Sequence, residues 1–267
     1  MRYVKGSIHL SQSQDHPLLK QVLRSEFVTH SQLYEFMRLR RQEWSRRSFD
    51  WRLHRLVNHR LVERFSCPSF RCDMVYSIAS IGASVLQGLG EYCLFASSRG
   101  NGSNEQVNML HAIELNELNL TLLRKEPTAR WAYATEIRSQ NELTRSGYSK
   151  DYDAVITLRF AGQDVQLAIE YERTPKAKKH YQAIASNLGC EAQVGRLLYL
   201  MPNYDLLSFV SGFFTEAALP VYFGLARDWH VQLLKMPVID PSSHSFITLS
   251  DVLEGSVCSP QMKLLRG

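Results

Sequence analysis

The chain has 267 residues, of which 45% are hydrophobic and 21% charged, and its formal net charge is +5. This composition is typical of a folded globular protein and excludes a disordered tail or a fibrous repeat. At about 150 residues per domain, the length favours two domains. The N-terminal segment lacks the apolar stretch of a signal peptide, and the apolar stretch 209–226 is interrupted by Glu216 and Pro220. We therefore expect a cytoplasmic protein with no membrane partner.

Positive charge is concentrated in the N-terminal third. Residues 1–99 hold 15 Lys and Arg against 8 Asp and Glu, whereas residues 100–267 hold 16 against 18. Between Arg38 and Arg64 there are nine Arg, no Lys and three acidic residues. Guanidinium groups suit contacts with phosphates and base edges, so this bias favours nucleic-acid binding. A solvated basic surface without a ligand is the alternative.

Three helices are predicted in this third of the chain. Asp15 is expected to cap a helix over 16–25, and Thr29 with Gln32 forms a capping box for a second helix. Ser48 is expected to cap a third helix that ends near His59 and turns its apolar stripe inward. The opposite, exposed face of the third helix is predicted to contact DNA through Arg47, Trp51, Arg52, Arg55, Asn58 and His59.

Two short strands, 61–67 and 72–78, are predicted after the third helix, followed by a helix that Ser80 caps. The sequence resembles bacterial winged helix-turn-helix domains over the stretch Leu53–Glu63, then Val75–Ile78 and Gly82. This resemblance implies that the third helix enters a major groove and that the hairpin lies over a neighbouring backbone. A winged helix used for protein contacts is the alternative.

The polar and glycine-rich segment 97–104 predicts a linker, so we expect a DNA-binding domain over 1–96 and a second domain over 105–267. In the second domain the pattern predicts helices over 107–125, 175–188 and 204–217. It also predicts strands over 131–138, 153–160, 165–172, 196–201 and 220–226. Residues 227–267 are expected to be less regular, with some strand near 246–249. The predicted class is α/β (α+β), and the core order is αβββαβ.

Three carboxylates are expected to meet at strand ends in this domain. Asp153 begins one predicted strand, while Glu170 and Glu172 end the next and share a face because they are two residues apart. Oxygen donors in this arrangement suit Mg²⁺ or Mn²⁺, which can stabilise charge on a phosphodiester. His111, Glu114 and Glu136 could add a ligand, although buried pairing with neighbours is the alternative for each.

The segments Tyr152–Asp153 and Ile169–Glu172 resemble the motif of PD-(D/E)xK nucleases, which have a restriction-endonuclease-like fold. With the winged helix and the segment Glu170–Tyr181, the chain also resembles the replication-relaxation family, which is akin to MobC-type plasmid mobilisation relaxases. The nuclease motif would have Lys where Glu172 stands, so Lys178 on the following helix is the expected substitute. Alternatively, Glu170 and Glu172 pair with Arg173 and Lys176 and the fold is inactive.

Together, these features predict a DNA-binding protein with a divalent-metal-dependent nicking domain that acts in plasmid or mobile-element mobilisation or replication. Its expected partners are double-stranded DNA and other mobilisation or replication proteins, and a homodimer is a further expectation. One alternative is a non-catalytic DNA-binding regulator whose second domain dimerises or recruits a partner. Another is an adaptor in a phage or transposon complex.

Overall fold

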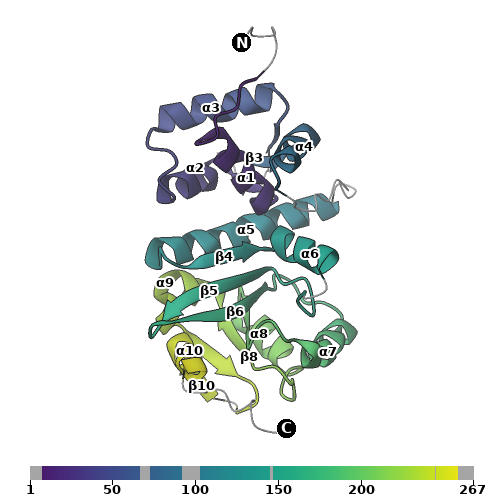
Figure 1. Ribbon diagram of the computed structural model, residues 1–267. Coiled ribbons are helices and arrows are strands. Elements are labelled where there is room, and N and C mark those ends of the chain that lie inside the picture. The colour runs from purple at the N-terminus through teal and green to yellow at the C-terminus, as the bar shows by residue number, and fades with distance from the viewer. Residues whose placement is uncertain (1–7, 67–72, 92–102, 145–146, 244, 258–267) are drawn as a thin grey trace, which may run out of the picture. The chain divides into compact units, whose positions relative to one another are not determined.

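The computed structural model describes residues 8–66, 73–91, 103–144, 147–243 and 245–257 (Figure 1). The chain divides into two compact units, 1–120 and 121–267, and the division falls within one helix, α5 (Ser103–Lys125). Both units mix helices with a sheet, in agreement with the predicted α/β class. The predicted linker, 97–104, lies outside the described residues except for 103 and 104, which begin α5. A domain boundary at that linker therefore stays a prediction.

The first unit contains a small antiparallel sheet with the strand order β1-β3-β2. Before α5 its elements are α1 (Asp15–Ser25), β1 (Val28–Thr29), α2 (His30–Leu39), α3 (Arg46–Asn58), β2 (Val62–Ser66), β3 (Met74–Ile78) and α4 (Ser80–Gly88). The predicted capping box is present, because the Gln32 N–H donates to Thr29 Oγ1 (3.2 Å) and the Thr29 N–H donates to Gln32 Oε1 (3.3 Å). Phe36, Phe49 and Leu56 are fully buried in the core, as the helical stripes predict.

For α1 and α3 the N-cap residue differs from the one predicted. Asp15 is the first residue of α1, after the N-cap residue Gln14, and its carboxylate accepts from the Ser11 N–H (2.7 Å). Helix α3 begins at Arg46, with Ser45 as its cap, so the prediction of Ser48 placed the start too late. The Ser45 hydroxyl accepts from the Ser48 N–H (3.4 Å), which is the usual N-cap geometry.

The first part of α5 packs against the first unit. The Gln32 side chain donates to the Ile113 carbonyl (2.9 Å), and the Asn116 side chain donates to the Phe27 carbonyl (2.8 Å). Met109 and Ile113 belong to one apolar cluster with Val75 of β3. A fragment that ends at residue 96 would therefore lack part of the packing of this unit.

Gly82 lets α4 approach the start of β2 closely. A Cβ atom built at Gly82 would lie 2.1 Å from the Leu61 carbonyl oxygen, which is far inside van der Waals contact. The same carbonyl accepts from the Ala79 N–H (3.1 Å), just before α4 begins. Glycine is therefore needed at this position by packing.

The second unit contains a seven-stranded mixed sheet with the order β10-β9-β8-β7-β6-β5-β4. Its strands are β4 (Arg130–Tyr133), β5 (Ala154–Phe160), β6 (Gln163–Tyr171), β7 (Leu197–Met201), β8 (Val221–Leu225), β9 (Pro237–Asp240) and β10 (Ser245–Thr248). Strands β6, β7 and β8 are parallel, and every other neighbouring pair is antiparallel. The turn between β5 and β6 uses Ala161 and Gly162, both with positive φ, where the sequence predicts a hairpin.

The helices of the second unit after α5 are α6 (Ala134–Leu143), α7 (Lys178–Asn187), α8 (Tyr204–Ser211), α9 (Ala226–Gln232) and α10 (Leu249–Val257), with short 3₁₀ turns at Leu188–Cys190 and Leu233–Lys235. Buried residues from α6, α7 and α8 form one cluster with Val155, Ala168 and Tyr199, so these helices cover one face of the sheet. Glu170 and Glu172 share that face with Ala168 because strand residues alternate.

Several predictions for the second unit differ from the structure. The strand expected over 131–138 ends at Tyr133, where α6 begins. Glu136, expected on that strand, lies in the first turn of α6, and its carboxylate accepts from the Tyr133 N–H (3.0 Å). Helix α7 begins at Lys178 instead of Pro175, because Ala177 has an extended backbone (φ −62°, ψ 140°) and is the N-cap residue. Before it, the Lys176 N–H donates to the Tyr181 hydroxyl (2.8 Å). The segment 227–267, expected to be less regular, contains α9, β9 and α10 as well, although its β10 confirms the strand predicted near 246–249.

The apolar stretch 209–226 contains the end of α8 and strand β8, but α8 ends at Ser211 and not at the predicted residue 217, so residues 212–220 connect the two elements. In the part of the chain that the structure describes, no helix combines the length and apolar character needed to cross a bilayer.

Candidate functional site

Asp153, Glu170 and Tyr199 lie in one row across three neighbouring strands of the second unit, here called the acidic row. Asp153 directly precedes β5, where Ala154 is paired with Ile169 of β6, so Asp153 lies beside Glu170. Glu170 is in turn the register partner of Tyr199 in the parallel strand β7. The Tyr171 N–H donates to Asp153 Oδ2 (2.7 Å), which fixes the aspartate at the end of the strand pair. The sequence therefore correctly predicts that two of its three carboxylates meet.

Glu170 is a buried acid in this row, with 6% of the residue exposed. Lys150 Nζ lies 2.7 Å from Glu170 Oε1 and forms an ion pair with it. The pKa of Glu170 is raised to about 7, chiefly by burial and in smaller part by the Asp153 carboxylate, although Lys150 acts in the opposite direction. A carboxyl group with a pKa near neutrality can exist in either protonation state under physiological conditions, a property that is frequent in catalytic sites.

Glu172 is 5% exposed and forms an ion pair with Lys176, whose Nζ lies 3.0 Å from Glu172 Oε2. Burial would lower the pKa of Lys176, but the neighbouring Glu172 carboxylate raises it above the ordinary lysine value. The lysine beside this glutamate is therefore Lys176. The predicted substitute, Lys178, is exposed in the first turn of α7. The Lys176–Glu172 pair is one that the alternative of an inactive fold predicts. Lys150, three residues before Asp153, was not predicted as a partner of Glu170.

Tyr199 adds an uncharged donor to the acidic row. The residue is 1% exposed, and among the described residues its hydroxyl has no hydrogen-bond partner. Burial raises its pKa well above the ordinary value, and the carboxylates of Glu170, Glu172 and Asp153 raise it further. A buried hydroxyl without a partner costs free energy, so its position beside the carboxylates needs an explanation.

The carboxylates of Asp153, Glu170 and Glu172 are the donors expected to hold Mg²⁺ or Mn²⁺. Within the described ranges, no group of three or more His, Cys, Asp or Glu side chains is arranged to hold a metal ion. Glu170 and Glu172 each pair with a lysine, and the register of β5 with β6 makes Asp153 and Glu170 the adjacent oxygen donors. Mg²⁺ commonly uses one or two carboxylates and completes its coordination with water and phosphate oxygens. The pair fits such an ion, whereas the predicted set of three carboxylates does not assemble.

The remaining candidates, His111, Glu114 and Glu136, are not part of the acidic row. Glu136 caps α6, as described above. His111 and Glu114 belong to the part of α5 that is assigned to the first unit, whereas the acidic row belongs to the second. Among the described residues, none of these three side chains belongs to a group of His, Cys, Asp or Glu that could hold a metal ion.

Arg52 of the first unit is buried, contrary to the prediction that it lies on the exposed face of α3. Its side chain is 8% exposed, and its guanidinium lies 3.2 Å from Asp15 Oδ1 and 3.4 Å from Glu43 Oε2. Arg55 pairs with the other Asp15 oxygen (2.5 Å), and its side chain is 23% exposed. Two of the six expected DNA-contacting residues thus hold α3 to α1, because a buried carboxylate needs cationic partners.

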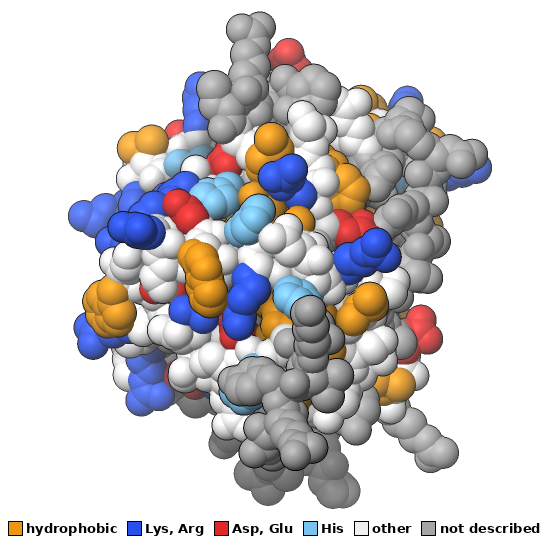
Figure 2. Space-filling model, turned by 90° about the horizontal axis from the view of Figure 1, so that it is seen from above, with side chains coloured by type: hydrophobic (Ala, Val, Ile, Leu, Met, Phe, Trp, Pro, Cys, Tyr) orange, Lys and Arg blue, Asp and Glu red, His pale blue; other side chains and the backbone are white. Residues whose placement is uncertain are grey.

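The other expected DNA-contacting residues of α3, Arg47, Trp51, Asn58 and His59, are exposed as predicted. Trp51 is 61% exposed, and the Arg55 guanidinium lies over its ring at 5.1 Å. Figure 2, which views the molecule from the α3 side of Figure 1, shows Lys and Arg side chains mostly on the left of this face, with histidine and apolar side chains among them. This face offers the charge and the polar groups that contacts with DNA require.

Comparisons with protein-family models, curated proteins and solved structures gave no match.

Proposed function

We propose that this chain is a DNA-binding protein whose second unit contains a phosphodiester-cleaving site. The observation that carries the proposal is the acidic row, in which Asp153 and the buried Glu170 lie side by side with Lys150 and Lys176 close to the glutamates. The restriction-endonuclease-like interpretation is supported by three antiparallel strands followed by a helix and a parallel strand, in the order β4-α6-β5-β6-α7-β7, although α6 interrupts the predicted run of strands. Membership of the replication-relaxation family and a role in plasmid mobilisation stay predictions from the sequence motifs.

In this proposal Asp153 and Glu170 hold a divalent ion, and the ion when bound polarises a phosphodiester and lowers the pKa of water. The chain's own groups do the remaining work. The Tyr171 N–H keeps the Asp153 carboxylate oriented. Lys150 compensates the Glu170 charge when no cation is bound, and its 21% exposed side chain can move to solvent or to a phosphate oxygen. Lys176, half exposed and held by Glu172, supplies a cation for the scissile phosphate.

The first unit supplies DNA affinity in this proposal. The order α1-β1-α2-α3-β2-β3 supports the winged helix-turn-helix interpretation, with the exposed side of α3 directed to the major groove. Arg47 and Trp51 would contact phosphates and sugars or bases, while Asn58 and His59 would contact polar groups near the helix end. Because Arg52 and Arg55 are engaged with Asp15, they hold the shape of this surface and contribute less to readout.

The test of cleavage uses supercoiled plasmid with the full chain in Mg²⁺ or Mn²⁺, and in EDTA as a blank. Asp153→Asn and Glu170→Gln should each reduce nicking by about 100-fold or more, because each removes an anionic ligand. Asp164→Asn is the matched control. Asp164 lies on the same sheet, but its partners are the exposed Arg130 and Arg159, so nicking should be unchanged. Absence of metal-dependent nicking by the parent protein, on plasmids that it binds, would refute the catalytic proposal.

The second candidate function is a non-catalytic DNA-binding regulator. It is favoured by the two ion pairs, Lys150–Glu170 and Lys176–Glu172, which neutralise the glutamates without any metal. Glu172→Lys separates the two candidates. It places a lysine where nuclease motifs have one, so retained or increased nicking supports an active site. If nicking is absent from both proteins and DNA binding is intact, the regulator is the better assignment.

A further inference from the structure

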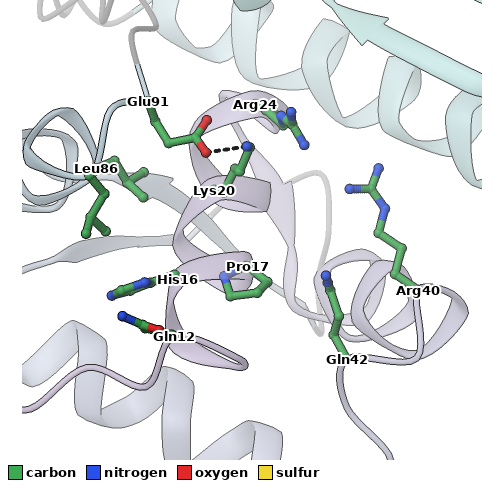
Figure 3. Close-up of a pocket in the computed structure, with 10 residues that line it drawn as sticks. Gln12, His16, Pro17, Lys20, Arg24, Arg40, Gln42, Leu86 and Glu91 are labelled. Atoms are coloured by element: carbon green, nitrogen blue, oxygen red, sulfur yellow. Dashed lines mark hydrogen bonds and ion pairs between the residues drawn. The ribbon is translucent and has the colours of Figure 1, made fainter.

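A pocket of about 440 Å³ in the first unit has no role in the proposed function (Figure 3). One wall is α1, where His16, Lys20 and Arg24 follow one another at intervals of four residues and so lie along one helix face. Arg40, directly after α2, also lines the pocket. The exposed α3 residues assigned to DNA are not among the lining residues, so this is a separate surface.

The lining is strongly biased towards positive charge. It contains Lys20, Arg24 and Arg40 together with His16, while Glu91 is the one acidic residue among the described lining residues. Glu91 forms an ion pair with Lys20, drawn as a dashed line in Figure 3. Both side chains are about one-third exposed, so an incoming anion can compete for the lysine. Guanidinium and ammonium groups around one space are the usual partners of phosphate.

The pocket also has an apolar side. Pro17, Leu86 and Leu89 line it, and Figure 3 shows Leu86 on the side opposite Arg40. Its volume falls within the range of roughly 300–1,000 Å³ that small-molecule sites occupy. A simple inorganic anion would leave the apolar side without a partner, whereas a nucleotide has both phosphates and a flat apolar base.

We propose that this pocket binds a nucleotide, with its phosphates near Arg24 and Arg40 and its base against Leu86. Lys20 contacts the phosphates after it leaves Glu91. The Gln12 and Gln42 amides, which also line the pocket, are available to hydrogen-bond the sugar or the base.

The test is calorimetric titration of the full chain with ATP, and separately with tripolyphosphate and with adenosine. ATP should bind more tightly than either fragment, because it alone occupies both sides of the pocket. Arg40→Glu should weaken ATP binding by about tenfold or more, since it replaces an attractive charge with a repulsive one. Arg41→Glu is the control, because the adjacent Arg41 is exposed and outside the lining. It should weaken binding less than about twofold.

Glu91→Gln tests whether misfolding explains a loss of ATP binding in the other variants. It is expected to strengthen ATP binding by freeing Lys20, and a damaged fold cannot produce such a gain. Absence of ATP binding up to about 5 mM would overturn the proposal. Equal losses in Arg40→Glu and Arg41→Glu would also overturn it. If Arg40→Glu weakens duplex DNA binding while ATP does not bind, the pocket receives a backbone phosphate and the nucleotide assignment is wrong.

Discussion

Replacement of Arg52 by methionine should destabilise the first unit. The Arg52 guanidinium lies between two buried carboxylates, 3.2 Å from Asp15 and 3.4 Å from Glu43, and it also donates to the Gln14 side chain (2.6 Å). Methionine approximates the apolar stem of arginine but removes the charge. Glu43, only 4% exposed, would then lose its ion-pair partner, while Asp15 would keep Arg55.

The size of the effect follows from the burial of the pair. Removal of one partner of a buried ion pair costs roughly 3–5 kcal/mol, because the remaining charge stays uncompensated. Since Asp15 keeps one arginine, we expect about 3 kcal/mol, the lower end of that range. In a unit of about 100 residues each kcal/mol lowers the melting temperature by roughly 4 °C or more, so the transition should fall by about 12 °C or more.

The assay is thermal unfolding of the full chain followed by circular dichroism. Hydrogen–deuterium exchange over α1 and α3 assigns the transition to the first unit. Arg47→Met is the matched control, because Arg47 is exposed on the same helix and should weaken DNA binding without lowering the melting temperature. An Arg52→Met protein that melts within about 2 °C of the parent, with unchanged exchange in α1, would refute this account of the buried pair.

The stability of the first unit should also depend on pH through Asp15 and its arginine partners. Burial raises the pKa of Asp15, but hydrogen bonds from Arg55, the Ser11 N–H and Arg52 outweigh it and hold the pKa below the ordinary value of 3.8. The unfolded chain therefore takes up protons first as the pH falls. The stability that Asp15 provides is present above pH 3.8 and is lost below it. In Arg52→Met part of this stability is already absent at neutral pH, so the acid-dependent loss should be smaller.

Three further predictions concern other buried positions. Because burial raises the pKa of Glu170 from 4.5 to about 7, the stability of the second unit should fall as the pH rises through that interval; urea unfolding of Glu170→Gln should lack this slope. Tyr199→Phe should change the free energy of unfolding by less than about 1 kcal/mol or increase it, and a larger loss in urea unfolding would indicate that the hydroxyl has a bound partner such as water. Gly82→Ala should lower the free energy of unfolding by about 1–3 kcal/mol in the same assay, because its Cβ meets the Leu61 carbonyl. Gly88→Ala, whose Cβ would have nothing within 4 Å, should instead stabilise α4 by roughly 0.5–1 kcal/mol. Equal effects of the two substitutions would contradict the packing argument.

Local features of the sequence predicted the elements well, and distant partners account for most of the errors. The Thr29–Gln32 capping box was recognisable because both of its bonds lie within four residues. Arg52 looked exposed on a helical wheel, but its partner Asp15 lies 37 residues earlier, and periodicity carries no information about such a pair. The pattern around Glu136 alternated like a strand, while the bond from Tyr133 to its carboxylate starts a helix there.

The candidate site was predicted in part for a similar reason. The meeting of Asp153 with Glu170 follows from a hairpin, whose register can be estimated from its turn. The lysines were predicted less completely. Lys176 was expected beside the glutamates only in the alternative of an inactive fold, because a predicted helix start at Pro175 favoured Lys178 as the cation of the site. Lys150 lies in a segment with no regular pattern and was not predicted. Tyr199 comes from a parallel strand, and its register with Glu170 cannot be read from the intervening residues.

The order of strands in the large sheet bears on how this unit can fold during synthesis. Each strand lies next to the strands that precede and follow it in the chain, so no later strand has to insert between two earlier ones. Contacts between sequence neighbours close short loops and form quickly. Asp153, Glu170 and Tyr199 can therefore come together as soon as β7 emerges, before β8, β9 and β10 are made. In an early folding intermediate β7 would be the edge strand of the sheet, with the acidic row next to that edge. Pairing of β8 with β7 then prevents the exposed edge from pairing with another chain.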